Sequence, residues 1–348
     1  VAPFDLNQGW GPGEEEGLER LSAGELKAER IRVGFKYRTG LRFAISHPDF
    51  NLKAARPDRP QNQMIRLKQW IPIVTGILAP VVGSSPAAEL ASLPVGRSEV
   101  TFNHNGQQRR LVITTPATCK GQEPCPVLFC FHGAGGKAEG PSRRWSRHAD
   151  RHGLMVVSAE AVQPQAKWNF RDKFHAEEHD DAGFISDVVE VLITEKIADP
   201  KAVYATGHSS GGLFCYRLAK ETDLFAAVAP MSCGMVKGAH DPGEKTNPLS
   251  IMQVIGDQDK SYRGSSNPKV TMYSAAQRIE IWRRFNRCLP DPVVLKKGEE
   301  VIVTTFTSPS GLEVAMCRVI GQGHHLRLDL RDRVDSAAVE FLLKHRAR

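Results

Sequence analysis

Short apolar runs alternate with amphipathic stretches along most of this 348-residue chain, from about residue 98 onward. Most of the apolar runs are four or five residues long, which is typical of strands buried on both faces of a sheet. The stretches between them repeat their apolar side chains at helical spacing. This alternation predicts an α/β fold in which helices cover both faces of a mostly parallel sheet. The expected strands are 127–131, 154–158, 202–205, 226–230, 251–255 and 314–320, and the expected helices are 181–197, 213–220, 275–287 and 334–344.

Two further segments complete the expected architecture. Residues 100–103 and 110–114 flank Asn105-Gly106, a typical turn pair, and predict an opening antiparallel hairpin. Residues 233–248 have the composition of a loop, which leaves no room for a large helical lid. Because sites in such sheets lie at the carboxyl ends of the strands, we expect the chemistry in the loops that follow them.

Residues 207–212 read Gly-His-Ser-Ser-Gly-Gly, between the strand expected at 202–205 and a helix. A Gly-x-Ser-x-Gly turn in this context is the nucleophile elbow of the α/β-hydrolase fold. Its neighbouring segments approach so closely that Gly207 and Gly211 must lack side chains. Ser209 is then left at the apex as the predicted nucleophile, which needs a base to accept its proton.

Residues 132–136 read His-Gly-Ala-Gly-Gly and follow the strand expected at 127–131. In this fold that loop supplies one backbone N–H to the oxyanion hole, and the residue after the nucleophile supplies the other. Ala134 is the first expected donor, with Gly135 as the alternative, and Ser210 is the second. Fixed N–H dipoles of this kind stabilise the charge that develops on the carbonyl oxygen.

The acid and the base should follow the nucleophile in the order acid, then histidine. Asp257 and Asp259 both lie in the turn after the strand expected at 251–255, and either could serve. His324 follows the last strand and is the predicted base, with His325 beside it as an exposed neighbour. The base takes the proton of Ser209 and later gives it to the leaving alcohol.

A competing metal motif lies at residues 175–179, which read His-Ala-Glu-Glu-His. The zinc chemistry of His-x-x-Glu-His needs a stable helix with both histidines on one face. Here the stretch lies in a polar loop, so we expect neither a metal nor another cofactor.

The sequence resembles a known family, the secreted esterases grouped as polyhydroxybutyrate depolymerase-like and feruloyl esterase-like, which are relatives of carbohydrate esterase family 1. The resemblance extends from about residue 109 to residue 323. It rests on five segments, 132–136, 168–169, 180–185, 204–212 and 225–230.

The resemblance implies the finer assignments. The acid becomes Asp259, the fourth residue of its Gly-x-x-Asp turn, and the base is His324, which follows a glycine. Members of the family also tend to pair a cysteine after the late helix with one in the last strand, which implies a Cys288–Cys317 disulfide. Apart from the resemblance, the expected substrate contacts are His132, Trp168 and His208, and a position in the core is an equal alternative for Trp168. Residues 325–327 read His-Leu-Arg where many members have Trp-Pro-Gly, so one wall of the pocket differs.

These residues together predict a serine carboxylesterase that works through an acyl-enzyme. The expected substrate is a feruloyl or related ester on plant polysaccharide, and the alternative is a polyhydroxyalkanoate or other polyester. A catalytically silent carbohydrate-binding domain is a remote alternative, and the intact triad argues against it. The substrate is expected to be an ester, whether small or polymeric.

The first 87 residues have a different pattern. Met64 and two positive charges precede an apolar run at 71–82 and small residues at 83–88, the order of a secretory signal peptide. Pro72 and Pro80 interrupt the run, which is short for a stable membrane span. We therefore expect an upstream extension at 1–63, a signal peptide at 64–87, a catalytic domain at 88–348, and a secreted or periplasmic protein. The alternative is an N-terminal helix packed on the domain.

The cysteines agree with export, and the charge bears on possible partners. In an oxidising compartment Cys119 and Cys125 are placed to close a small ring, whereas Cys130 is expected as a buried free thiol. The pairing of Cys215 and Cys233 stays open. The formal charge of +7 is spread along the chain without a basic block, which argues against a nucleic-acid partner.

Overall fold

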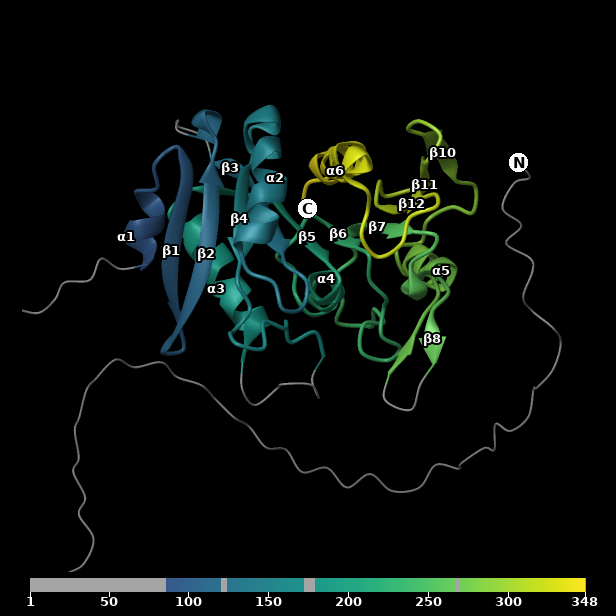
Figure 1. The fold of residues 1–348 in the computed structure, drawn as a ribbon, viewed down its shortest axis with the longest axis horizontal. Coiled ribbons are helices and arrows are strands. Elements are labelled where there is room, and N and C mark those ends of the chain that lie inside the picture. Colours follow the sequence, from purple (N-terminus) through teal and green to yellow (C-terminus); the bar gives the residue numbers. More distant parts are fainter. Residues whose placement is uncertain (1–85, 120–123, 172–178, 267–269, 348) are drawn as a thin grey trace, which may run out of the picture. The chain divides into compact units, whose positions relative to one another are not determined.

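A single twisted sheet forms the centre of the fold in the computed structural model, which describes residues 86–119, 124–171, 179–266 and 270–347. Within these ranges the sheet has ten strands in the order β1-β2-β4-β3-β5-β6-β7-β12-β11-β10 (Figure 1). The strands are β1 (Gly96–His104), β2 (Gln107–Thr115), β3 (Cys125–Phe131), β4 (Met155–Ala159), β5 (Ala198–His208), β6 (Ala227–Met231), β7 (Ser250–Gly256), β10 (Val293–Lys296), β11 (Val301–Thr307) and β12 (Glu313–Val319).

The middle of the sheet is parallel and both edges are antiparallel. The strands β4, β3, β5, β6, β7 and β12 pair in parallel, so their carboxyl ends meet at one edge. The predicted opening hairpin is confirmed as β1 and β2, with Asn105 and Gly106 at φ values of 50° and 79°. Two successive residues in this left-handed region match the tight turn that Asn-Gly favours.

Helices cover the two faces of the sheet and enclose two apolar cores. One core packs α1, α3, α4 and α5 against the sheet, and the other packs α2 and α6 (Figure 1). Successive residues of β3 alternate between the cores, with Phe129 in the first and Leu128 in the second. Burial on both faces explains the continuous apolar run of this strand. The helices are α1 (Pro86–Ala91), α2 (Glu139–His152), α3 (Asp181–Thr194), α4 (Ser210–Glu221), α5 (Ala275–Phe285) and α6 (Leu328–Leu343).

The segment between β6 and β7, all of which is described, forms no helix. The expectation of an α/β-hydrolase fold without a large lid at this place is confirmed. A two-stranded ribbon, β8 (Ser265–Ser266) with β9 (Thr271–Met272), follows β7 instead.

The cysteines confirm one prediction about pairing and contradict another. Cys119 and Cys125 form a disulfide, as expected, and Cys130 is a buried free thiol. The predicted Cys288–Cys317 disulfide is wrong, because both residues are free. Cys288 packs in the core beneath α5, whereas Cys317 points from β12 into the core beneath α6, so the sheet lies between their side chains.

The N-terminal predictions lie mostly outside the described residues. The extension at 1–63 and all but the last two residues of the expected signal peptide fall there. The expected cleavage near Ala87 falls inside α1, whose Leu90 is buried in the core. In the described ranges, no helix is long and apolar enough to span a bilayer. The signal peptide and the domain boundaries therefore stay predictions.

Candidate active site

Ser209 occupies the sharp turn between β5 and α4. Its φ of 56° and ψ of −114° place a residue with a side chain in a strained region of backbone space. A Cβ on Gly207 would lie 2.4 Å from the carbonyl carbon and oxygen of Gly211, and one on Gly211 would lie 2.4 Å from the carbonyl oxygen of Phe131. The backbone N–H of Ser209 donates to the Met231 carbonyl at 3.0 Å, which ties the turn to β6. The glycines thus permit the close approach that leaves Ser209 at the apex.

Asp259 and His324 form a hydrogen-bonded pair beyond the ends of β7 and β12. The Nδ1 atom of His324 lies 2.9 Å from Oδ2 of Asp259. The other oxygen, Oδ1, accepts hydrogen bonds from the backbone N–H and the hydroxyl of Ser261 at 2.8 and 2.7 Å. Burial opposes ionisation of the Asp259 carboxyl, but the hydrogen bonds from His324 and Ser261 outweigh it and lower its pKa to about 2. Asp259 is therefore a carboxylate at neutral pH.

The structure separates the two candidate acids that share this turn. Asp257 accepts a hydrogen bond from the backbone N–H of Gly321 at 2.8 Å, so its carboxylate braces the loop that leads to His324. Asp259 alone of the two contacts the histidine. Ser261 was missed by sequence reasoning, although a serine two residues after a capping aspartate is a recognisable local signal.

The predicted nucleophile, acid and base line one pocket of about 270 Å³. Leu213, Cys233 and Met272 add apolar surface to its wall, while Lys260, Ser261 and Ser265 add polar groups. The three residues come from loops far apart in the sequence, and the parallel strands bring them to the same edge of the sheet.

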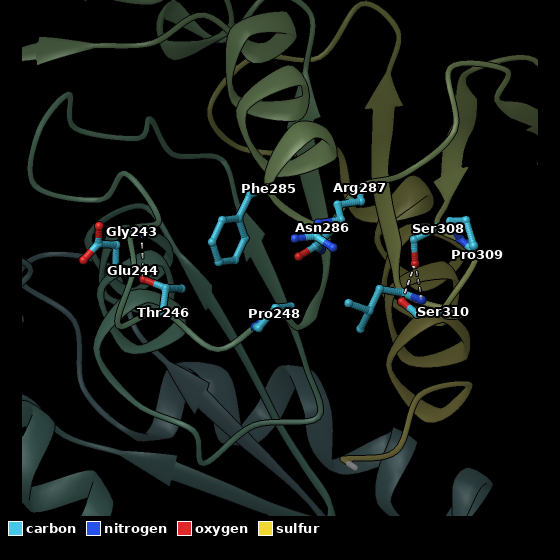
Figure 2. Close-up of a pocket in the computed structure, with 11 residues that line it drawn as sticks. Gly243, Glu244, Thr246, Pro248, Phe285, Asn286, Arg287, Ser308, Pro309 and Ser310 are labelled. Carbon is cyan, nitrogen blue, oxygen red and sulfur yellow. Dashed lines mark hydrogen bonds between the residues drawn. The ribbon is translucent and has the colours of Figure 1, made fainter.

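A second cavity, of about 730 Å³, lies elsewhere (Figure 2). Its lining includes Pro248, just before β7, and Ser308, in the turn between β11 and β12. Since β7 and β12 are parallel, this cavity is at the amino ends of the strands, whereas the predicted triad lies at their carboxyl ends. The smaller pocket is therefore the candidate active site, despite its lesser volume.

The expected oxyanion loop lies against the nucleophile. A Cβ on Gly133 would lie 3.5 Å from Cβ of Ser209. The backbone N–H of Gly135 donates to the Ala166 carbonyl at 3.0 Å, so the alternative donor is already engaged, and Ala134 is exposed at the loop tip. Ser210 is the first residue of α4. The backbone N–H groups in the first turn of a helix have no acceptor within that helix, and the N–H of Ser210 is one of them.

Two residues expected to contact substrate, Trp168 and His132, make buried hydrogen bonds that support the expected oxyanion loop at 132–136. Trp168 is fully buried, and its indole N–H donates to the His132 carbonyl at 2.9 Å. On His132, Nε2 accepts from the N–H of Ala161 at 3.0 Å, and Nδ1 then donates to the Gly133 carbonyl at 2.7 Å. Burial lowers the pKa of His132, with partial opposition from that last hydrogen bond. Both rings support the loop, and of the two alternatives for Trp168 its burial bears out the core position and rules out a wall of the pocket.

The third expected contact, His208, lies between the nucleophile and the base. Its ring packs on His325 with centroids 5.2 Å apart, and on His324 at 4.9 Å. Burial lowers the pKa of His208 to about 4. This side chain is therefore neutral at the site.

Two segments that carry the family resemblance meet beneath the loop. Asp181, at the start of α3, pairs with Arg109 of β2 at 2.6 Å, and both side chains are buried. The second oxygen of Asp181 accepts from the backbone N–H of Asn169 at 2.7 Å. These motif residues fix the chain path next to Trp168 and do not touch the pocket.

The His-Ala-Glu-Glu-His stretch at 175–179, where we expected no metal, lies largely outside the described residues. Only His179 of the 175–179 stretch is described, and its Nδ1 lies 3.4 Å from the side-chain amide nitrogen of Gln107. Among the described residues, no group of three or more potential metal ligands is gathered in one place.

No protein-family model matches the chain. It is 25% identical over 231 residues to feruloyl esterase B of Piromyces equi, an alignment that covers 62% of this chain and 42% of that protein. The chain thus spans less than half the length of this relative.

Two solved structures share the fold. The acetyl xylan esterase from Aspergillus awamori matches with a TM-score of 0.52 at 14% identity, covering 71% of this chain and 98% of the other. LpqC, a poly(3-hydroxybutyrate) depolymerase from Bordetella parapertussis, matches with a TM-score of 0.51 at 19% identity, covering 73% and 92%. This chain thus has the α/β-hydrolase fold of these two structures, and its sequence is similar to that of feruloyl esterase B.

Proposed function

We propose that this chain hydrolyses carboxylic esters through an acyl-enzyme formed on Ser209. The observation that carries the proposal is the convergence of a strained serine and a hydrogen-bonded Asp259–His324 pair on one pocket. A sharp Gly-x-Ser-x-Gly turn alone, or a hydrogen-bonded His–Asp pair alone, also occurs in proteins for purely structural reasons. Their meeting at the carboxyl ends of the strands, next to a glycine-rich loop, is what nucleophilic catalysis requires.

The proposed reaction begins when Ser209 attacks the ester carbonyl and its proton passes to Nε2 of His324. The carboxylate of Asp259 holds Nδ1–H and thereby leaves Nε2 as the basic nitrogen. The ester C–O bond then breaks, and His324 donates the proton to the leaving alcohol. A water molecule, deprotonated by the same nitrogen, hydrolyses the acyl-enzyme and releases the acid.

The backbone N–H groups of Ala134 and Ser210 are proposed to stabilise the oxyanion in both steps. Removing one such donor typically costs about 3 kcal/mol of transition-state stabilisation. The Gly135 N–H bonds to Ala166, and the ring of His132 braces the same loop. These contacts support a loop shape that is set before substrate binds.

We propose a feruloyl or related polysaccharide-linked ester as the substrate, with a polyester as the alternative. The pocket wall formed by Leu213, Cys233 and Met272 suits an apolar acyl group. The segment between β6 and β7 forms no helix over this pocket, which suits a bulky or polymeric ester. The feruloyl esterase relative favours the first substrate, and the likeness to LpqC favours the second.

We also propose that the protein works outside the cytoplasm. The Cys119–Cys125 disulfide supports an oxidising compartment, where such bonds form and persist. The signal peptide expected at 64–87 would provide the route.

The test is a panel of initial rates on p-nitrophenyl butyrate, methyl ferulate, a hydroxybutyrate oligomer and a peptide anilide. We expect ester turnover by the wild type, no turnover of the anilide, and loss of at least about 10⁴-fold in the Ser209→Ala variant. The ranking of ferulate against oligomer decides between the two substrates. Ester turnover that survives in folded Ser209→Ala would remove the proposal, and no ester turnover by the wild type would favour a silent binding domain.

A further inference from the structure

Arg278 is a fully buried side chain on α5, with 1% of its surface exposed. A buried guanidinium is costly unless its donors are satisfied, and burial of an arginine usually comes with a carboxylate partner. Among the ion pairs of the described residues, none involves Arg278. Its hydrogen-bond acceptors are neutral oxygens, which is unusual enough to need a reason.

The guanidinium bridges two loops that line the candidate active site. Its Nη2 donates to the Ser261 carbonyl at 2.8 Å, and its Nη1 donates to the Cys233 carbonyl. Cys233 and Ser261 both line the pocket that contains Ser209 and His324. One planar group therefore joins the loop after β6 to the loop after β7.

Two more acceptors fix the guanidinium itself. Its Nε donates to the Ser274 carbonyl, one turn earlier at the start of α5, at 3.2 Å. The side chain of Gln253, on β7, lies against it, and its amide oxygen accepts from Nη1 and Nη2 at 2.9 Å when that oxygen faces the guanidinium. We assign this orientation because the other would place an amide –NH₂ against three donors. The fork of Arg278 is thus held in the plane that both carbonyls require.

Each bridged loop leads directly to a member of the proposed triad. Ser261 donates two hydrogen bonds to Oδ1 of Asp259, whose Oδ2 meets Nδ1 of His324. On the other side, Cys233 lies two residues after Met231, whose carbonyl accepts the N–H of Ser209. The path from Arg278 to the acid therefore has one intervening residue, and the path to the nucleophile runs through a short stretch of chain.

We propose that Arg278 is a positioning residue that sets the separation between the acid–base pair and the nucleophile. This inference rests on the proposed triad. A lysine cannot replace it, because a single ammonium cannot reach two carbonyls from different loops in the geometry of a planar fork. A misplacement of reacting groups by about 1 Å can cost about 100-fold in rate, so the effect belongs on kcat.

The test compares Arg278→Lys and Arg278→Met with Arg284→Met, a matched variant on the same helix. The side chain of Arg284 is 75% exposed and pairs with Glu280 at the surface. Rates on p-nitrophenyl acetate are referred to the active sites counted by a fluorophosphonate probe, so that loss of folded protein is removed from the comparison. We expect kcat to fall between about 10- and 100-fold in both Arg278 variants with little change in KM, and to stay unchanged in Arg284→Met.

The rate per active site separates positioning from general destabilisation. A displaced Asp259–His324 pair slows the chemical step in every folded molecule, whereas a destabilised fold lowers the number of active sites without changing the rate at each one.

A double-mutant cycle with Ser261→Ala supplies the second criterion. If Arg278 acts through Ser261, the losses in Arg278→Lys and Ser261→Ala should combine to less than their product. Wild-type kcat in folded Arg278→Lys would overturn the inference, even if Arg278→Met does not fold. A Ser209→Ala variant that keeps its activity would instead remove the triad, so the two failures are distinguishable.

Discussion

The ring of His208 is joined to the main chain of His324 by a hydrogen bond, with Nε2 3.0 Å from the carbonyl oxygen. A carbonyl can only accept, so Nε2 must carry the proton, and Nδ1 keeps its lone pair. Burial lowers the pKa of His208 to about 4, although the bond to this carbonyl opposes the shift. The residue before the nucleophile thus anchors the backbone of the base without carrying charge.

Loss of this anchor should reduce turnover more than stability. In His208→Ala the loop that bears His324 loses a fixed contact, and we expect kcat for p-nitrophenyl butyrate to fall between about 10- and 100-fold. Thermal unfolding should change by only a few degrees, because one hydrogen bond contributes about 1 kcal/mol. His325→Ala is the control, since its exposed ring packs on His208 without a hydrogen bond to the loop. Equal losses in both variants would argue that ring packing, and not the anchor, matters.

The steric demands of the elbow give a prediction about stability. A Cβ on Gly211 would lie 2.4 Å from the Phe131 carbonyl oxygen, a backbone atom that cannot turn aside. Gly211→Ala should therefore destabilise the fold by about 3 kcal/mol or more. Gly140 in α2 is the matched control, because nothing lies within 4 Å of its added Cβ and alanine favours helices. Urea unfolding of both variants measures the difference, and a Gly211→Ala midpoint equal to that of Gly140→Ala would contradict the close packing.

The elbow could be predicted because its cause is local. The spacing of Gly207, Ser209 and Gly211 between a strand and a helix determines the turn whatever surrounds it. The β3 run was equally clear, since burial on both faces leaves only apolar side chains in this strand. The order of acid and histidine then follows from the parallel sheet, which brings distant loops to one edge.

Other features depend on which way a side chain faces, and a sequence does not state this. Cys317 and Cys288 both lie in or near the late strands, but the alternation of β12 sends Cys317 to the opposite face. Trp168 follows a polar loop yet is wholly buried. The helix α2 was missed because arginines and histidines dominate it, and its buried positions include Ser142 and His148.

The number of free thiols should match the structure, in which Cys288 and Cys317 are unpaired, and not the disulfide that the family resemblance implies. All seven cysteines lie in the described residues, with one disulfide and five free thiols. Alkylation of the denatured, unreduced protein should therefore modify five cysteines, and peptide mass mapping should find Cys288 and Cys317 among them. A Cys288–Cys317 cross-linked peptide would contradict the separation of these side chains by the sheet.

The disulfide itself should stabilise the fold modestly. Cys119 and Cys125 are six positions apart in the sequence, and closing so small a ring limits the entropy removed from the unfolded chain. Replacing both residues by serine should cost about 2 kcal/mol in the free energy of unfolding. Cys130→Ser is not a suitable control, because it would bury a hydroxyl in the core beneath α2. Reduction of the wild type with dithiothreitol provides the comparison, and an unchanged urea midpoint would contradict the prediction.

His148 should make the fold sensitive to mild acid. It is fully buried in α2, neither ring nitrogen has a hydrogen-bond partner among the described residues, and burial lowers its pKa from 6.5 to about 4. Between these values the unfolded chain binds a proton that the folded chain refuses, so stability is complete above pH 6.5 and falls as the pH drops towards 4. The loss from this one group is at most about 3 kcal/mol.

The measurement is the free energy of unfolding by urea at several pH values between 7 and 4. His148→Leu removes the titrating ring and two unpaired polar atoms, so its stability should match or exceed that of the wild type at neutral pH and decline less steeply in acid. His325→Ala, at an exposed position, should retain the slope of the wild type. Equal slopes in all three proteins would mean that other groups, such as the buried His240, whose pKa is also lowered to about 4 by burial, dominate the acid response.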